Sequence, residues 1–297
     1  SLSQNQFPSH FTYNFLNSGS GSVGSWYSDG WNIISANGCP NVQNYGGLWM
    51  PDDYYSNLWA SGYDLYIGGM QNRVAEQFAI DVSTSDGLLV LKQWMYDHLE
   101  GAPTGGIVNF SAGISVGNYY MDGDIITSWG SPVNHAMTIV GWDDNIEYDF
   151  NNDGYFTNNV DLNGDDVIDM RDWEKGAVIM VNSWGNYWGN SGKAYIPYRL
   201  LAESIENGGI FSNKVYSINV KESYSPLLVL KTKISHSSRE KISVKAGVSN
   251  NLSATTPDYI MDFPIFNYQG GDLPMNGSNS TPLELALDIT PLLSYFD

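Results

Sequence analysis

The segment at residues 182–192, which reads Asn-Ser-Trp-Gly-Asn-Tyr-Trp-Gly-Asn-Ser-Gly, constrains the fold more than any other part of the sequence. Short apolar runs at 177–181 and 193–197 flank it, which is the pattern of two strands joined by a turn-rich connection. Glycine recurs within the segment, and glycine adopts tight-turn conformations that other residues avoid. The segment therefore predicts neighbouring strands linked by a compact connection that is rich in aromatic side chains.

A second segment, at residues 134–142, places Asn-His in front of the strand-like run Ala-Met-Thr-Ile-Val-Gly-Trp. His135 and Asn182 then each stand at the edge of a predicted strand. In this order the two segments resemble the papain family, whose histidine strand reads roughly NHAVxIVGY and is followed by NSWGxxWGxxGY. The resemblance implies an α+β, papain-like cysteine peptidase fold, with a helical part and a twisted antiparallel β-barrel part.

The resemblance also implies a role for each of these residues. A thiol becomes a thiolate near neutral pH when an imidazole takes its proton, and that imidazole needs a partner on its other nitrogen. His135 would be the general base and acid, Asn182 would orient it, and Trp184 would shield the bond between them, with Gly185 and Trp188 in support. The implied activity is hydrolysis of peptide bonds in proteins or peptides through an acyl-enzyme.

Three candidates are open for the nucleophile, because the only cysteine is Cys39. Cys39 follows the end of a predicted helix and precedes a proline, whereas the family's cysteine opens a long helix. Residues 7–19 resemble the stretch that follows that helix, which places the nucleophile upstream of residue 1, in an N-terminal segment of the same precursor. The second candidate is Cys39 itself. The third is that Ser25 occupies the position of the family's cysteine, or that the site is catalytically inactive.

Two acidic stretches between the two segments follow the calcium-loop pattern, with oxygen ligands at alternating positions and a backbone carbonyl at position 7. In the loop at 161–172 the predicted ligands are Asp161, Asn163, Asp165, Val167 through its carbonyl, Asp169 and Asp172. In the loop that opens at 149 they are Asp149, Asn151 and Asp153, and Val160 stands at the closing position. The pattern is dockerin-like or EF-hand-like and predicts one Ca²⁺, or two if the first loop borrows a ligand.

The remaining pattern predicts two domains. Helices are expected at 22–36, with Val23, Trp26, Trp31 and Ile34 on one face, from Ser85 onward, with Leu88, Leu91, Trp94 and Met95 buried, and at 197–206. Strands are expected at 106–110 and 214–220. From residue 227 alternating strands at 228–235, 241–246 and 283–289 indicate a small all-β sandwich. We therefore expect a peptidase domain at 1–222, lacking its catalytic-helix segment and carrying a calcium-loop insertion at 143–174, and an accessory sandwich at 223–297 whose last strand ends as in a truncated domain.

The composition restricts the partners and the location. The net charge of −19 would repel nucleic acid, and the surplus of carboxylates serves either solubility or cation binding. The most apolar stretches, such as 177–181, are too short to cross a bilayer. One cysteine permits no intrachain disulfide. With the resemblance, these features predict a secreted or cell-surface bacterial protein, either a peptidase or a catalytically inactive, calcium-stabilised binding or adhesion module.

Overall fold

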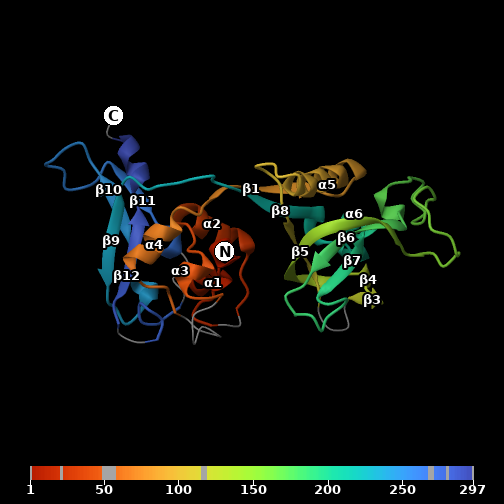
Figure 1. The fold of residues 1–297 in the computed structure, drawn as a ribbon, viewed down its shortest axis with the longest axis horizontal. Coiled ribbons are helices and arrows are strands. Elements are labelled where there is room, and N and C mark those ends of the chain that lie inside the picture. Colours follow the sequence, from red (N-terminus) through yellow and green to blue (C-terminus); the bar gives the residue numbers. More distant parts are fainter. Residues whose placement is uncertain are drawn as a thin grey trace. The chain divides into compact units, whose positions relative to one another are not determined.

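The computed structural model describes residues 2–20, 23–48, 58–114, 119–266, 271–278 and 281–295, and its fold is of the α+β class with one large sheet (Figure 1). Contacts divide the chain into two compact units. Unit 1 joins Ser1–Glu76 to Val220–Asp297, and unit 2 is the continuous stretch Gln77–Asn219.

The large sheet dominates unit 2. Its strands are β1 (Val74–Asp81), β2 (Val108–Gly113), β3 (Tyr120–Asp122), β4 (Ile125–Ser128), β5 (Gly130–Glu147), β6 (Lys175–Val181), β7 (Lys193–Pro197) and β8 (Lys214–Val220). They lie in the order β1-β8-β2-β5-β6-β7-β4-β3. The long strand β5 pairs antiparallel with β2 on one side and with β6 on the other, while β4 and β7 pair in parallel. The helical segments of this unit are α5 (Ser85–Leu99), α6 (Tyr198–Ala202), η2 (Met170–Asp172), η3 (Ile205–Asn207) and η4 (Phe211–Asn213).

The core of unit 2 forms between these strands and α5. Alternate residues of the strands, such as Phe110 and Ile139, are fully buried, and α5 adds Leu88, Leu91 and Met95. Burial of those three helix residues confirms the predicted face, although Trp94 is only partly buried. Ser85 was expected to cap this helix, but the cap is Thr84, whose side chain accepts the hydrogen bond from the Gly87 N–H.

Unit 1 combines the N-terminal helices with the C-terminal strands. Its elements are η1 (Leu2–Gln4), α1 (Ser9–Leu16), α2 (Tyr27–Asn37), α3 (Val42–Tyr45), α4 (Tyr63–Gly69), β9 (Val229–Ile234), η5 (Arg239–Lys241), β10 (Lys245–Val248), β11 (Tyr259–Asp262), η6 (Pro264–Phe266), β12 (Leu283–Asp288) and η7 (Thr290–Tyr295). Among the described residues the strands form two small antiparallel sheets, β10 with β11 and β9 with β12.

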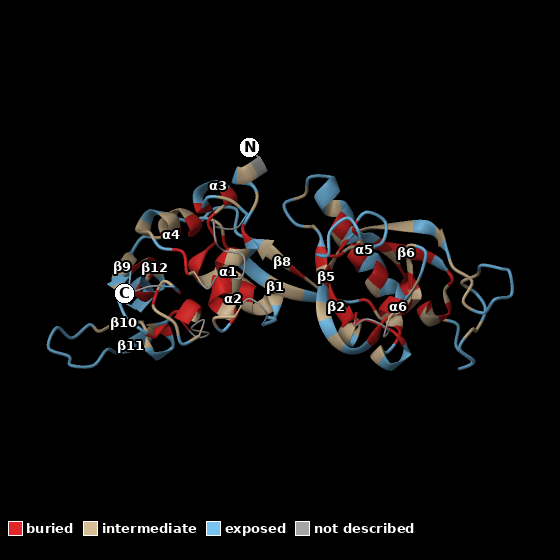
Figure 2. Ribbon diagram, turned by 90° about the horizontal axis from the view of Figure 1, so that it is seen from below, coloured by how far each residue is buried: buried red, intermediate tan, exposed pale blue. Residues whose placement is uncertain are grey.

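Helices and strands of unit 1 share one hydrophobic core. Phe11, Phe15 and Ile33 of the helices pack in the same buried cluster as Leu285 and Leu287 of β12. Figure 2 shows the buried segments in two groups, one around α1 and α2 and the other around β2, β5, β6 and α6. The change in sequence pattern predicted a domain boundary after residue 222. The contacts instead group the C-terminal strands with the N-terminal helices.

The predicted elements agree with the structure to different degrees. The strands at 193–197 and 214–220 are confirmed with the same bounds as β7 and β8. The helix predicted at 22–36 is α2, which begins at Tyr27; Ser22 lies outside the described residues. Its predicted buried face is wrong, because Val23 and Trp26 precede the helix and are exposed, while Gly30, Ile33 and Asn37 are buried.

The C-terminal strands were predicted in part. The strand expected at 241–246 begins only at Lys245, because Arg239–Lys241 forms a 3₁₀ turn instead. The β10 partner β11 was not predicted at all, since its residues lie exposed and carry no regular alternation of burial. The strand at 283–289 is confirmed as β12.

Candidate active site

The register of the large sheet brings His135 and Asn182 together. In the antiparallel pair of β5 and β6, Thr138 lies opposite Val181, and Asn182 follows directly after β6. Continuing this register by one residue places Asn182 opposite Met137, so that His135 is its diagonal neighbour. Diagonal neighbours across an antiparallel pair are within reach of long or aromatic side chains. Asn182 stands at the end of a strand, as predicted, whereas His135 lies inside β5 and not at its edge, because β5 already begins at Gly130.

The two side chains are hydrogen-bonded. The Nε2 atom of His135 lies 2.9 Å from the Oδ1 atom of Asn182. Because an amide oxygen can only accept, Nε2 carries the proton in this arrangement, and the neutral ring keeps its lone pair on Nδ1. His135 is half-buried, so its ring is not enclosed in the core. The pair thus holds a proton acceptor in one tautomer and one orientation.

Asn182 is the more deeply buried member of the pair. Its side chain is buried, and its backbone N–H donates to the carbonyl of Gly192 at 3.0 Å, which ties the start of the connection to its end. The Nδ2 atom of Asn182 is enclosed and has no hydrogen-bond partner within the described part of the chain. An enclosed, unpaired donor costs about 1–3 kcal/mol. Asn182 is fixed at its backbone by the bond to Gly192 and at its side chain by the contact with His135.

Aromatic side chains lie beside the pair. The Trp184 ring centroid is 5.3 Å from that of His135, and Trp184 packs edge-on against Trp188 at 6.1 Å. The Trp188 indole N–H donates to the Tyr119 hydroxyl at 3.2 Å. Trp184 is 45% exposed, so one face lies toward the histidine while another faces solvent. Tyr119 was missed in the sequence because nothing in its neighbourhood resembles a motif.

In the connection at 182–192, glycine is required at position 189, because the backbone of Lys193 lies too close for a side chain. Gly189 has φ +53°, and a Cβ at this position would lie 2.3 Å from the carbonyl oxygen of Lys193. Gly185 also has positive φ, at +82°, but open space around its missing Cβ. The turn at Gly189 thus brings the chain against β7 and sets the position of the neighbouring Trp188.

Neither candidate nucleophile of this sequence has the environment of an activated one. Cys39 belongs to unit 1, is 2% exposed, and its thiol contacts the carbonyl of Pro40 at 3.5 Å. Burial raises the pKa of the Cys39 thiol to about 12, whereas a catalytic thiol has a lowered pKa. Ser25 is exposed and precedes α2 instead of lying on it, and Gly21 and Ser22 of its motif lie outside the described residues.

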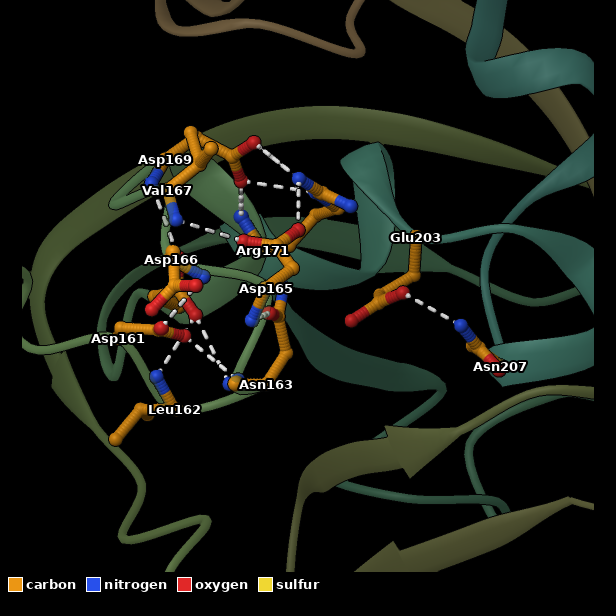
Figure 3. Close-up of polar contacts among 12 residues, drawn as sticks. Asp161, Leu162, Asn163, Asp165, Asp166, Val167, Asp169, Arg171, Glu203 and Asn207 are labelled. Atoms are coloured by element: carbon orange, nitrogen blue, oxygen red, sulfur yellow. Dashed lines mark hydrogen bonds and ion pairs between the residues drawn. The ribbon is translucent and has the colours of Figure 1, made fainter.

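The predicted calcium loops leave β5 and return to β6. Between Glu147 and Lys175, which pair across the two strands, the chain makes two loops with similar internal bonding. In the second loop, Asp161 accepts backbone N–H groups of Gly164 and Asp166, Asn163 accepts that of Asp165, and Asp165 accepts that of Val167 (Figure 3). In the first loop, Asp149 accepts from Asp153 and Gly154, Asn151 from Asp153, and Asp153 from Tyr155.

The backbone of both loops takes positive φ at the same places. Position 4 is Asn152 at +61° and Gly164 at +76°, and position 6 is Gly154 at +81° and Asp166 at +65°. Asp at position 6 therefore adopts the left-handed conformation that the loop pattern requires there. The two segments are copies of one loop structure.

Each loop is closed by a buried acid. Asp172, at the end of the second loop, accepts the N–H groups of Leu162, Asn163 and Asp169. Glu174 accepts those of Phe150 and Thr157, which are positions 2 and 9 of the first loop, as Leu162 and Asp169 are of the second. The sequence missed Glu174 because it lies far outside the first loop's own span, in which Val160 holds the closing position.

The second loop also contains a cation of its own. The Arg171 guanidinium donates to Asp169 at 2.6 Å and pairs with Asp165 at 2.7 Å (Figure 3). This partner holds the pKa of Asp169 below its usual value. Within the described residues, no three His, Cys, Asp or Glu side chains converge as a metal site. The backbone path fits a calcium loop, while two of the predicted carboxylates in the second loop are engaged by arginine.

No helix among the described residues is both long and apolar enough to cross a membrane. No family model matches the chain, and no curated protein matches it either.

Several solved structures are similar to the chain. A clostridial cysteine protease, Cwp84 after propeptide cleavage, is 14% identical, with a TM-score of 0.46, and the match covers 96% of this chain and 69% of that one. A second structure holds the cysteine protease and lectin-like domains of Cwp84, a surface layer associated protein of Clostridium difficile. It is 14% identical with a TM-score of 0.40, and the match covers 88% of this chain and 55% of that one. Bromelain from Ananas comosus is 15% identical with a TM-score of 0.39, over 73% of this chain and 79% of that one.

Proposed function

We propose that this chain carries the acid–base part of a papain-like cysteine peptidase, which hydrolyses peptide bonds in proteins or peptides through an acyl-enzyme. The observation that carries the proposal is the 2.9 Å contact between His135 Nε2 and Asn182 Oδ1. It leaves Nδ1 as the free base, and a base held by a third group is the arrangement that activates a nucleophile. Trp184 beside the imidazole supports the proposal.

The proposed reaction passes one proton through His135. Nδ1 takes the thiol proton, and the thiolate attacks the substrate carbonyl carbon. As the C–N bond breaks, the imidazolium returns the proton to the leaving amine, and a thioester remains. His135 then takes a proton from water, whose oxygen attacks the thioester, and the proton returns to the departing thiolate. Asn182 keeps the ring in one orientation and stabilises its charged form through the Oδ1 contact.

The thiol in this proposal is not Cys39, because a buried thiol whose pKa is about 12 is a poor nucleophile. We place it upstream of residue 1, in a segment of the same precursor, as the resemblance implies. The same resemblance supports export to the cell surface or the medium.

The test is labelling of the precursor with a thiol-reactive peptidyl inhibitor, followed by mass spectrometry of the labelled peptide. We expect one labelled cysteine upstream of residue 1, a loss of about 10²–10⁴-fold in labelling rate in His135→Ala, and no change in Cys39→Ala. His236→Ala serves as the matched control. Labelling of Cys39, or a rate that His135→Ala leaves unchanged, contradicts the proposal.

A second candidate is a catalytically inactive binding or adhesion module. The burial of the only thiol favours it, because the sequence then offers no reactive cysteine of its own. The two candidates separate in the same experiment: an inactive module gives no labelled cysteine in the folded precursor, although it binds a peptide.

We also propose that the loops at 149–154 and 161–172 bind Ca²⁺. The repeated loop backbone supports it, and carboxylate and amide oxygens are ligands that calcium prefers. Glu174 would close the first loop, with Asp149, Asn151 and Asp153, and Ca²⁺ would replace Arg171 beside Asp165 and Asp169 in the second.

Calorimetric titration with CaCl₂ tests this proposal. Asp149→Asn and Asp161→Asn each keep one of the two oxygens that accept backbone N–H groups but lose the negative charge, so each should remove or weaken one site. Asp258→Asn, at an exposed acid outside the loops, should change nothing. Absence of calcium-dependent heat, or equal heat in all three variants, contradicts the proposal.

A further inference from the structure

A groove of about 540 Å³ lies between β1 and α5, away from His135 and Asn182. We call it the edge groove. It is lined by Phe78, Ala79, Ile80, Asp81, Gly87, Val90, Gln93, Trp94 and Asp97. All of these residues belong to unit 2, and neither the candidate active site nor the calcium loops contribute to it.

The groove runs along the edge of a strand. Its floor includes four successive residues of β1, from Phe78 to Asp81, and successive side chains of a strand point to opposite faces. A groove that touches all four therefore follows the backbone. Among the described strands, β1 is the outermost of its side of the sheet, with β8 as its neighbour. The far side of an edge strand presents N–H and C=O groups that the sheet itself does not use.

One part of the groove is apolar. Phe78 of β1 and Trp94 of α5 meet edge to face at 4.8 Å between ring centroids. Val90, one turn earlier on α5, is 55% exposed. Figure 1 shows α5 beside the end of β1. An apolar side chain entering between Val90 and the two rings would remove them from water.

Acidic groups stand at the groove. Asp81 lies at the end of β1, and hydrogen bonds from Ser83 hold the pKa of its carboxyl below the usual value. Asp97 lies one turn beyond Gln93, whose side-chain amide donates to it. The lining residues include no lysine or arginine, although Lys214, outside the lining, acts on the Asp81 carboxylate. A partner with a basic residue therefore complements the groove in charge, and the net charge of −19 favours the approach of such a partner.

We propose that the edge groove binds an extended, basic segment of a protein partner, which adds to β1 as a further strand, places an apolar side chain against Val90, Phe78 and Trp94, and sets a lysine or arginine beside Asp81 or Asp97. Strand addition takes its affinity from main-chain hydrogen bonds and its specificity from pockets for alternate side chains. In this groove the edge of β1 before Asp81, whose carbonyl lies against Gly87 of α5, would supply the first, and the apolar side chains of Val90, Phe78 and Trp94 the second.

The probe is an acetylated, amidated peptide of alternating valine and threonine with a lysine at each end, titrated into the whole chain. Binding is followed through the indole N–H signals in a ¹H–¹⁵N spectrum, in which the Trp94→Phe variant identifies Trp94. We expect a saturable shift of the Trp94 signal with Kd below about 1 mM, the weak range for a short peptide. A peptide with glutamate in place of lysine should bind at least about 10-fold more weakly, and salt should weaken the lysine peptide.

Matched variants decide whether the groove is the site. Val90→Asp places a charge in the apolar wall and should weaken binding at least about 10-fold, a loss of about 1.4 kcal/mol. Leu89→Asp makes the same change on the neighbouring exposed residue of α5, outside the lining, and should leave Kd unchanged. A third peptide with proline in place of the central residues, which cannot donate main-chain hydrogen bonds, should not bind. The proposal is overturned if no shift saturates, if Val90→Asp and Leu89→Asp behave alike, or if the proline peptide binds equally.

Discussion

At the scale of single residues, the candidate site depends on what a carboxamide can do that a carboxylate cannot. The Oδ1 atom of Asn182 accepts the hydrogen bond from His135 without placing a negative charge beside the ring. The ring is then held in one orientation. Trp184 supplies an apolar neighbour on one face. These contacts follow from the register of β5 and β6.

Gly189 is the residue on which the aromatic connection depends. Gly189→Ala should lower the free energy of unfolding by about 2–4 kcal/mol, because it adds left-handed strain and places a methyl group 2.3 Å from the Lys193 carbonyl oxygen. Gly123→Ala is the matched control. Gly123 has φ +59°, similar to the +53° of Gly189, but nothing lies within 4 Å of its missing Cβ, so only the strain of about 1 kcal/mol remains. Equal losses in urea denaturation would contradict the close approach.

At the scale of elements, the hairpin of β5 and β6 carries both the site and the loops. The sequence predicted this arrangement, because each motif sits at the boundary of an apolar run. Strands 193–197 and 214–220 were also predicted with their bounds, since Gly192 precedes the first, Pro197 ends it and Asn213 precedes the second. What failed was α2, where aromatic residues are so dense that several faces look apolar. The role of Glu174 could not be predicted, because it depends on a contact between residues far apart in sequence.

Glu174 should matter more to the first loop than its exposed neighbour Glu147. Glu174→Ala leaves the N–H groups of Phe150 and Thr157 without their acceptor, at about 1–3 kcal/mol each. Glu147→Ala removes only an exposed ion pair with Lys175, worth less than about 1 kcal/mol. Hydrogen exchange at the Phe150 and Thr157 amides measures the difference. Similar protection in the two variants would show that Glu174 does not hold the loop.

At the scale of the whole molecule, the grouping of the N-terminal helices with the C-terminal strands was beyond the sequence. The sequence pattern changes near residue 222, but such a pattern describes only local structure. The grouping rests on packing between residues more than 200 positions apart, such as the ion pair of Arg73 and Asp288 at 2.8 Å. Arg73 also donates to the carbonyls of Met70 and Ala36, and lies over the Tyr224 ring at 4.1 Å.

Breaking this ion pair tests the grouping. Asp288→Ala leaves a buried guanidinium without its carboxylate and should destabilise unit 1 by about 3–5 kcal/mol. Glu284→Ala, on the same strand, removes the more exposed pair with Lys233 and should cost less than about 1 kcal/mol. Hydrogen exchange in α1 and α2 is the readout, because a shared core transmits the loss to the helices. If only β9 and β12 lose protection in Asp288→Ala, the C-terminal strands form a separate domain.

The central claim is that Asn182 holds the neutral His135 ring in the Nε2–H form, with Nδ1 free to take a proton. Long-range ¹H–¹⁵N NMR of the imidazole, at a pH about one or two units above the ordinary histidine pKa, measures the tautomer directly. We predict a protonated Nε2 and an unprotonated Nδ1 in the native chain, and a mixture of tautomers in Asn182→Ala. A native ring protonated on Nδ1, or a tautomer that Asn182→Ala does not change, would contradict the account.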